Sequence, residues 1–400
     1  MCPIVKKEIF IPDYALAVMH ALQSAGEQVY IVGGCVRDAL LGIEPHDYDM
    51  TVSCPPERTL ELLADFRTVA TGLKHGTVTA ISDGHPIEIT TFRTDGSYTD
   101  SRRPDSVEFT RSVEDDLSRR DFTVNAMAYS HESGLIDLFG GVDDLEKRVI
   151  RAVGRAETRF GEDALRIMRA FRFSAQLGFD IDPDTLSGAS LASCGLKNIA
   201  RERIGSEFVR LLCSDSPCKA LALMKESGIL DYASRAYSPS DALISLLPSI
   251  ENSDVARLGL YLSEADEPLA RDVLNSLKVS NRQKSGALCI ARESRVSVVT
   301  PADAAHLRAR AGEYAEQAAI ASVLLKSSPA HAIELIRSSS APRSISDLAI
   351  GGAELIEMGY SGREIGKELA ALLELTMSGE LPNERERLID LAKKHIKEGE

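Results

Sequence analysis

The sequence predicts an α+β protein whose strands lie in about the first 148 of its 400 residues. Two observations support this prediction. In the N-terminal part, apolar residues alternate in period two around turn residues such as Asp83-Gly84. After about Val149 the strand signals fade and 3.6-residue periodicity continues, with breaks near Pro183, Pro217, Pro301 and Pro382. The remainder should therefore be helical.

The N-terminal elements follow in order from local patterns. The run VYIV reads as a strand, and Gly33-Gly34 then turns the chain into a segment with helical spacing, VRDALLG. Residues 93–106 contain one aromatic residue and almost nothing to bury, so we expect a long exposed loop there. The other expected elements are a helix at 13–22, strands at 29–32 and 47–52, a helix at 36–42, and hairpin strands at 77–82 and 86–92.

Composition restricts the class of protein. The net charge of -14 argues against a generally basic surface, so any RNA site must be a local basic patch. The seven cysteines show no C-x-x-C pair and no zinc spacing, which indicates reduced, core-filling thiols. The apolar runs are too short for a membrane span, and the N-terminus lacks the apolar segment of a signal peptide. We expect a cytoplasmic protein without membrane contact, and no obligatory protein partner is evident.

Three carboxylates form the first candidate site. Asp47 and Asp49 are two residues apart in a predicted strand, so both can leave one face and share two divalent ions. Two-metal nucleotidyl transfer requires this geometry, although D-x-D alone is also common in solvated turns. Glu88 faces opposite to its apolar neighbours in the hairpin. It is either a third carboxylate of the site or a solvent-facing strand residue.

Two further motifs can bind phosphate. Gly33 and Gly34 lie where a strand meets a helix, and residues without Cβ let a phosphate approach the backbone amides. Arg37 lies one helical turn further on; the alternative is a tight turn with a surface Arg-Asp pair. The segment RRDFTVNAMA at 119–128 places two arginines before an apolar stretch, and these arginines need an anion. The aspartate of the segment can also cap a helix, and both interpretations can hold together. The candidates in this segment are Arg120, Asp121 and Asn125.

The run RFGEDALRIMRAFRF carries the strongest signal. Arg166, Arg169 and Arg172 recur every three residues on a helix expected to begin near Glu162. A solvated charged face is the usual explanation for such a run. Only Glu162 and Asp163 can pair with these arginines locally, which leaves positive charge for phosphates or bases.

Together these motifs resemble one family. The set VGGCVRDALLG, DYD, IEITTFRTDG, RRDFTVNA, GEDALRIMRAFRF and ERIGSEF, in this order, is similar to class II tRNA nucleotidyltransferases, the family of bacterial CCA-adding enzymes and poly(A) polymerases. The likeness continues through IGKELAALLELTMSGELPNERERLIDLAKK and so covers essentially the whole chain. It implies a polymerase-β-like nucleotidyltransferase head with a small mixed sheet at 1–148. A helical neck at 149–213, a body at 214–300 and a tRNA-binding tail at 301–400 would follow.

The resemblance also implies roles for the candidate residues. Asp47 and Asp49 would bind two Mg²⁺ ions, Gly34 and Arg37 would contact the triphosphate, and CTP and ATP would be the substrates. The tRNA would be bound through its acceptor stem and 3′ end. Arg120, Arg169 and Arg172 would contact the incoming nucleotide, while Asp163 and Arg166 would read the base.

Base reading by this last pair has an independent physical reason. Cytosine and adenine both present an amino donor beside a ring-nitrogen acceptor. A carboxylate at Asp163 accepts from the amino group, and Arg166, at i+3, donates to the ring nitrogen. Uracil and guanine present the reverse order, and each buried polar group left unpaired costs about 1–3 kcal/mol. The protein would then replace a template strand.

The expected activity is therefore addition of C, C and A to the tRNA 3′ end. An A-adding tRNA nucleotidyltransferase or a poly(A) polymerase of the same family is the nearest alternative, because C and A share the donor-acceptor edge. The presence of residues 93–106 argues against a CC-only enzyme, since the resemblance implies that such variants lack this segment. A non-catalytic RNA-binding relative is the second alternative, but it would not need paired metal ligands.

Overall fold

The computed structural model describes residues 4–5, 8–73, 76–95, 107–235 and 237–398. Its chain forms two compact units, residues 1–211 with 223–232, and residues 212–222 with 233–400. Among the described residues, no helix is both long enough and apolar enough to span a membrane. The four-part division at residues 148, 213 and 300 stays a prediction.

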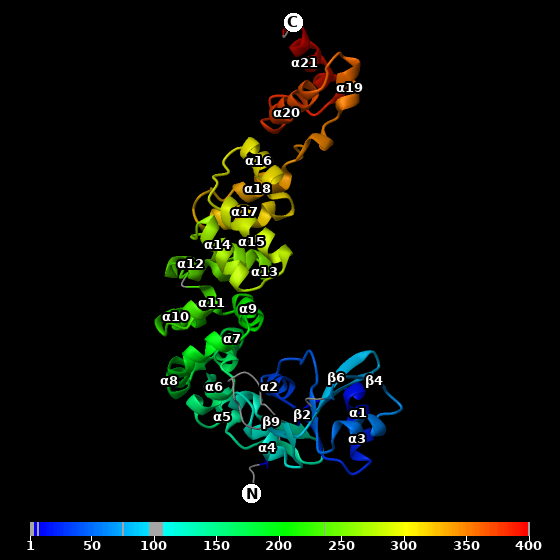
Figure 1. The fold of residues 1–400 in the computed structure, drawn as a ribbon, viewed down its shortest axis with the longest axis vertical. Coiled ribbons are helices and arrows are strands. Elements are labelled where there is room, and N and C mark those ends of the chain that lie inside the picture. The colour runs from blue at the N-terminus through cyan, green and yellow to red at the C-terminus, as the bar shows by residue number, and fades with distance from the viewer. Residues whose placement is uncertain (1–3, 6–7, 74–75, 96–106, 236, 399–400) are drawn as a thin grey trace. The chain divides into compact units, whose positions relative to one another are not determined.

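Within the described residues, the N-terminal part of the first unit contains an eight-stranded sheet in the order β1-β10-β9-β2-β3-β6-β5-β4 (Figure 1). β3 and β6 are parallel and the other neighbours are antiparallel, so the sheet is mixed, as predicted. The strands are β1 Ile4–Val5, β2 Val29–Val32, β3 Met50–Val52, β4 Arg67–Gly72, β5 Thr77–Ser82, β6 His85–Thr91, β9 Met127–Ser130 and β10 Gly134–Asp137.

Strand β2 shows why this part of the sequence is so apolar. All four of its residues are buried, and since successive side chains point to opposite faces, both faces of the sheet are covered there. Helix α1 (Asp13–Gln23) packs against β2 and β5. Helix α4 (Val113–Ser118) contributes Val113 and Leu117 to a buried cluster with Tyr30 and Val32.

Most predicted N-terminal elements are present. Helix α2 (Gly34–Leu40) follows directly from the glycine turn. Asp83 and Gly84 both have positive φ, 49° and 82°, as expected for the predicted two-residue hairpin turn between β5 and β6. The helix predicted to start near Asp121 is only a single 3₁₀ turn, Thr123–Asn125, which leads into β9.

Two boundaries were wrong. The strand predicted at 47–52 begins only at Met50, so the two aspartates precede β3. Arg93–Asp95, expected in a loop, forms β7 and pairs with β8 (Val107–Phe109), because the backbone can pair although its side chains have little to bury. The rest of the predicted loop, residues 96–106, lies outside the described residues.

Helices dominate from residue 141 on, which confirms the predicted α+β class. The exception is a parallel pair of two-residue strands, β11 Val149–Ile150 and β12 Asp180–Ile181. The helices up to residue 234, besides those already given, are α3 Pro56–Leu62, α5 Gly141–Lys147, α6 Ala156–Glu162, α7 Leu165–Leu177, α8 Pro183–Ala192, α9 Arg201–Leu212, α10 Pro217–Glu226 and α11 Leu230–Ser234. Those after residue 234 are α12 Asp241–Leu246, α13 Asp254–Tyr261, α14 Glu267–Ser276, α15 Asn281–Glu293, α16 Pro301–Ala311, α17 Ala315–Leu324, α18 Ala332–Ser338, α19 Gly352–Glu357, α20 Arg363–Met377 and α21 Arg385–Glu398.

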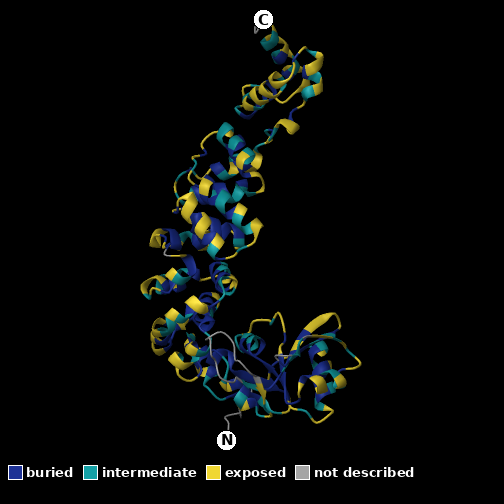
Figure 2. Cartoon of the chain, viewed as in Figure 1, coloured by how far each residue is buried: buried dark blue, intermediate teal, exposed yellow. Residues whose placement is uncertain are grey.

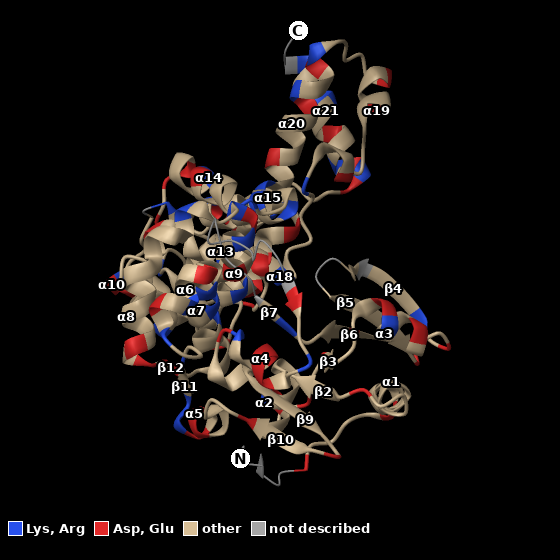
Figure 3. Cartoon of the chain, turned by 60° about the horizontal axis from the view of Figure 1, so that its bottom comes forward, with Lys and Arg blue, Asp and Glu red and all other residues tan. Residues whose placement is uncertain are grey.

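The C-terminal helices form two separate cores (Figure 2). One contains buried residues from Val298 to Ile336, on α16, α17 and α18 and in the segment before α16. The other contains buried residues from Leu348 to Ala392, on α19, α20 and α21 and in the segments that flank α19. Acidic and basic residues mix along α20 and α21, so their exposed surface is not uniformly basic (Figure 3).

Candidate active site

One cavity of about 690 Å³ in the first unit is lined by all thirteen residues that the sequence predicts for catalysis and nucleotide binding. They come from the turn before α2, the segment before β3, strand β6, the segment after α4, and α7 with the residues before it. The lining contains nine arginines and five acidic side chains, an excess of positive charge in a chain with net charge -14. The predicted members are Gly33, Gly34, Arg37, Asp47, Asp49, Glu88, Arg120, Asp121, Asn125, Asp163, Arg166, Arg169 and Arg172.

The two aspartates occupy one side of the cavity. Tyr48 is buried whereas Asp47 and Asp49 are exposed to the cavity, so the expected shared face holds although both residues precede the strand. The Asp49 carbonyl accepts from Val32 N at 3.0 Å, which continues the β2–β3 pairing by one residue. Because Met50 pairs with Ile89, the register places Glu88 beside Asp49.

These carboxylates repel one another. Desolvation by the surrounding protein raises the pKa of Asp49 to about 6, and the negative charges of Asp47 and Glu88 contribute to the rise. The positive charge of Arg120 acts in the opposite direction. Acidic groups that share a site in this way are stabilised by a bound cation.

The glycine turn lies against two arginines. Gly33 has φ of 75°, and a Cβ there would lie 3.1 Å from Nη1 of Arg120, so both backbone and packing favour glycine. Arg37 is buried and donates to Asn125 Oδ1 at 2.7 Å and to Asp38 at 2.8 Å. The predicted Arg-Asp pair therefore exists, but its arginine faces the cavity and not the solvent.

Arg120 forms an ion pair with a carboxylate that was not selected from the sequence. Asp116 of α4 is fully buried, and it accepts from Arg119 at 2.7 Å and from Arg120 Nη2 at 3.2 Å. Burial opposes its ionisation, but the positive charges of Arg120 and Arg119 hold the pKa of Asp116 below its usual value. Within the described residues, the buried Nε of Arg120 has no partner.

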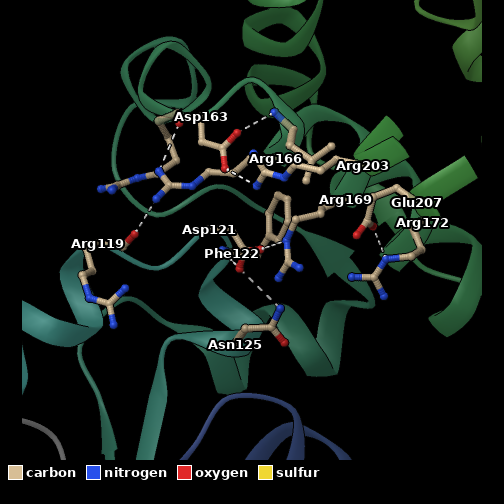
Figure 4. A network of polar contacts seen from close by, with 12 residues as sticks. Arg119, Asp121, Phe122, Asn125, Asp163, Arg166, Arg169, Arg172, Arg203 and Glu207 are labelled. Carbon is tan, nitrogen blue, oxygen red and sulfur yellow. Dashed lines mark hydrogen bonds and ion pairs between the residues drawn. The ribbon is translucent and has the colours of Figure 1, made fainter. Parts of the chain in front are cut away.

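The α7 arginines have partners that the sequence analysis did not anticipate (Figure 4). Arg169 Nε donates to Asp121 at 2.6 Å, and Arg172 Nε donates to Glu207 of α9 at 2.5 Å. Arg166 donates to Glu162 at 2.5 Å, which with Asp163 was one of the two local partners that the sequence predicted. Although burial raises the pKa of Asp121, the Arg169 guanidinium lowers it below the usual value. The expectation that these arginines lack distant acidic partners was therefore wrong, whereas the lining of the cavity keeps the expected excess of positive charge.

Asp163 does not lie on the same helix as Arg166. Helix α6 ends at Glu162 and α7 begins at Leu165, and Asp163 lies between them with extended backbone, φ of −139° and ψ of 104°. Its carboxylate accepts from Leu165 N at 3.0 Å and from Arg203 at 3.1 Å. The predicted helix start near Glu162 was wrong, because the chain breaks there and the Asp163 side chain satisfies an amide at the start of α7.

Comparisons with known proteins agree with this site. The Poly A polymerase head domain family matches residues 29–151, and the family described as the probable RNA and SrmB-binding site of polymerase A matches residues 178–236. A CCA-adding enzyme of Lacticaseibacillus paracasei is 36% identical over 390 residues, which cover 95% of this chain and 96% of that protein. This chain belongs to the CCA-adding enzyme family.

Two further comparisons extend this result. A CCA-adding enzyme of Leuconostoc citreum is 49% identical over 218 residues, 54% of each chain. The solved structure of the Bacillus stearothermophilus CCA-adding enzyme in complex with CTP has 31% identity and a TM-score of 0.82, and the match covers 97% of this chain and 98% of that one. The predicted family, fold class and enzyme class are thus confirmed, and the chain is a nucleotidyltransferase.

In this member of the CCA-adding enzyme family, the cavity also includes residues that were not selected from the sequence. They are the arginines 93, 119, 203 and 210, together with Phe173 and others. Asp116 could have been found, because it lies on α4 and precedes Arg119 and Arg120, which follow the end of that helix, by three and four residues. Glu207 could not, because its contact with Arg172 joins residues 35 apart on different helices.

Proposed function

We propose that this chain is a CCA tRNA nucleotidyltransferase, which adds C, C and A to the 3′ end of tRNA from CTP and ATP without a nucleic-acid template and releases pyrophosphate. The observation that carries this proposal is the single cavity whose lining brings Asp47 and Asp49 together with a group of arginines. The likeness to a CCA-adding enzyme solved with CTP supports it.

Two Mg²⁺ ions are the proposed cofactor, with Asp47 and Asp49 as ligands. The raised pKa of Asp49 beside Asp47 and Glu88 reflects negative charge that a divalent cation would offset. Within the described residues no group of three or more side chains is placed to hold a metal ion. Proteins commonly bind Mg²⁺ through one or two carboxylates together with substrate phosphates. When bound, the ions would activate the attacking 3′-hydroxyl and stabilise the leaving pyrophosphate.

The triphosphate is proposed to lie against Gly33, Gly34 and Arg37. A glycine turn that opens a helix offers backbone amides to an anion, and Arg37 adds a charge that Asn125 fixes in place. Arg120, Arg169 and Arg172 complete the anion-binding side of the cavity. Arginine suits this task because its planar guanidinium matches the geometry of phosphate oxygens.

Asp163 and Arg166 are proposed to select the base. Asp163 precedes α7 and Arg166 lies on it, but both side chains line the cavity. Base selection requires only that the two side chains reach the edge of one base. Asp163 would accept from the amino group of cytosine or adenine, and Arg166 would donate to the ring nitrogen. Arg203 already contacts Asp163 and can keep its carboxylate in orientation.

We propose that the reaction takes place in the cytoplasm, with the acceptor stem and 3′ end of tRNA as the RNA partner. To test the activity, the protein is incubated with tRNA lacking CCA and with each labelled nucleotide, and the product 3′ ends are sequenced. The proposal predicts C, C, A and then a stop. Addition of A only, or of a long A tail, would identify the alternative members of the family, and no incorporation would identify a non-catalytic relative.

A further inference from the structure

The ring of Phe173, on α7, lies among three of the arginines that line the cavity. The Cζ atoms of Arg172, Arg169 and Arg37 lie 4.0, 5.2 and 5.4 Å from the ring centroid. These distances are within the range of cation–π attraction. Phe173 is itself buried and lines the same cavity. One ring therefore contacts guanidinium groups from two different helices.

An aromatic ring holds a guanidinium differently from a carboxylate. The cation is attracted to the face of the ring without a hydrogen-bond acceptor, so the contact does not need to use up N–H donors. Arg169 donates only through Nε, to Asp121, and Arg37 and Arg172 donate through Nε and Nη1. Within the described residues, both Nη groups of Arg169 and the Nη2 groups of Arg37 and Arg172 donate to no protein acceptor. These donors remain available for an anion.

The ring is itself fixed by its neighbours. Phe122 is fully buried and meets Phe173 edge to face, with centroids 5.7 Å apart and an interplanar angle of 78°. Phe122 follows Asp121, which holds Arg169. Two consecutive residues of the segment after α4 thus anchor both the ring and one of its cations.

We propose that Phe173 is a positioning residue that sets the donors of Arg37, Arg169 and Arg172 for the phosphate groups of the incoming nucleotide. This inference rests on the proposed function, because it assumes that the anion in the cavity is a nucleoside triphosphate. It predicts an effect on phosphate binding, whereas the reacting centre at Asp47 and Asp49 and the choice of base at Asp163 stay unchanged.

The test compares Phe173→Leu with a matched control, Phe179→Leu. Phe179 is also buried and its ring also contacts one arginine, with Arg148 Cζ at 5.2 Å from the centroid, but neither residue lines the cavity. The measurements are kcat and KM for CTP on tRNA lacking CCA, the inhibition constant of inorganic tripolyphosphate, and the ratio of C to U incorporation. Thermal unfolding of each variant shows whether it is folded.

For Phe173→Leu, KM for CTP and the inhibition constant of tripolyphosphate should both rise roughly tenfold, equal to about 1.4 kcal/mol. The kcat value and the C to U ratio should stay near wild type, and Phe179→Leu should change none of these quantities. Unchanged KM and inhibition constants, or a loss confined to kcat, would overturn the proposal.

A second experiment remains decisive if Phe173→Leu does not fold. Replacing the Phe173 ring with rings that carry one, two and three fluorine atoms keeps its size while weakening the negative potential of its face. KM should rise step by step with fluorination; a constant KM would refute the positioning role. If the wild type incorporates no nucleotide, the proposed function fails, and calorimetric binding of tripolyphosphate to the same proteins still decides the role of the ring.

Discussion

Ion pairs in the cavity and in the second unit are arranged in opposite ways. In the cavity some of the cations are buried, since Arg37 and Arg172 are only 9% and 6% exposed. In the second unit, Glu293 of α15 is 2% exposed and accepts from Arg292 and from Arg310 of α16, each at 2.9 Å. The side chains of those two arginines are 56% and 43% exposed.

The difference indicates what each group of charges does. At Glu293 the protein satisfies a buried acid with two solvated cations, which completes the pairing and joins two helices. In the cavity, the Nη2 groups of buried Arg37 and Arg172 have no protein acceptor among the described residues, and burying such cations costs free energy that an anionic ligand can offset. The first arrangement serves stability and the second serves binding. The three predictions below test this comparison.

The largest expected effect is at the carboxylate side of the cavity. Asp47→Ala or Asp49→Ala should reduce nucleotide incorporation on the order of a thousandfold or more, because metal ions supply several kcal/mol of transition-state stabilisation. Stability and most tRNA affinity should persist, since both side chains are exposed to the cavity and the tRNA should be held mainly by the helical region. Single-turnover rates in magnesium check this, and near-normal turnover of either variant would rule out the two-metal assignment.

A smaller and opposite effect is expected at Glu293. Glu293→Gln keeps the shape but weakens charge-assisted hydrogen bonds to Arg292 and Arg310, so the free energy of unfolding should fall by about 2 kcal/mol. The rate of CCA addition at a temperature where the variant is folded should equal that of the wild type. Denaturant unfolding and rate measurements on Glu293→Gln and Asp49→Ala together form the test. If Glu293→Gln loses activity without losing stability, the comparison fails.

The carboxylate side of the cavity could be predicted almost completely from the sequence. The shared face of Asp47 and Asp49 depends only on the alternation of extended backbone, which persists even though both residues precede β3. The position of Glu88 depends on one parallel pairing, Met50 with Ile89, between strands that were both expected. Short-range geometry was therefore sufficient for the two aspartates, whereas the sequence left the position of Glu88 open because it depends on this long-range pairing.

The arginine side could be predicted only in part. The spacing of Arg166, Arg169 and Arg172 predicted the helix that carries them. The apolar residues expected to face the core are fully buried: Ile167, Met168, Phe171 and Ala175. The acceptors Asp121 and Glu207 are 48 and 35 residues away from their arginines, and no local pattern indicates such contacts. The break before Leu165 was missed because GEDALRIMRAFRF has continuous helical spacing, whereas Asp163 adopts extended backbone.

The central claim is that side chains of this cavity take the place of a template, and Asp163→Ala tests it most directly. The measurement is competition between CTP and UTP on tRNA lacking CCA, with purified and folded protein. Without this carboxylate, the O4 atom of uracil no longer meets a negative charge, so U incorporation relative to C should rise roughly tenfold, equal to about 1.4 kcal/mol. The rate with CTP should fall far less than in Asp49→Ala. An unchanged ratio of C to U would contradict base selection by Asp163 and reduce its role to the contacts with Leu165 N and Arg203.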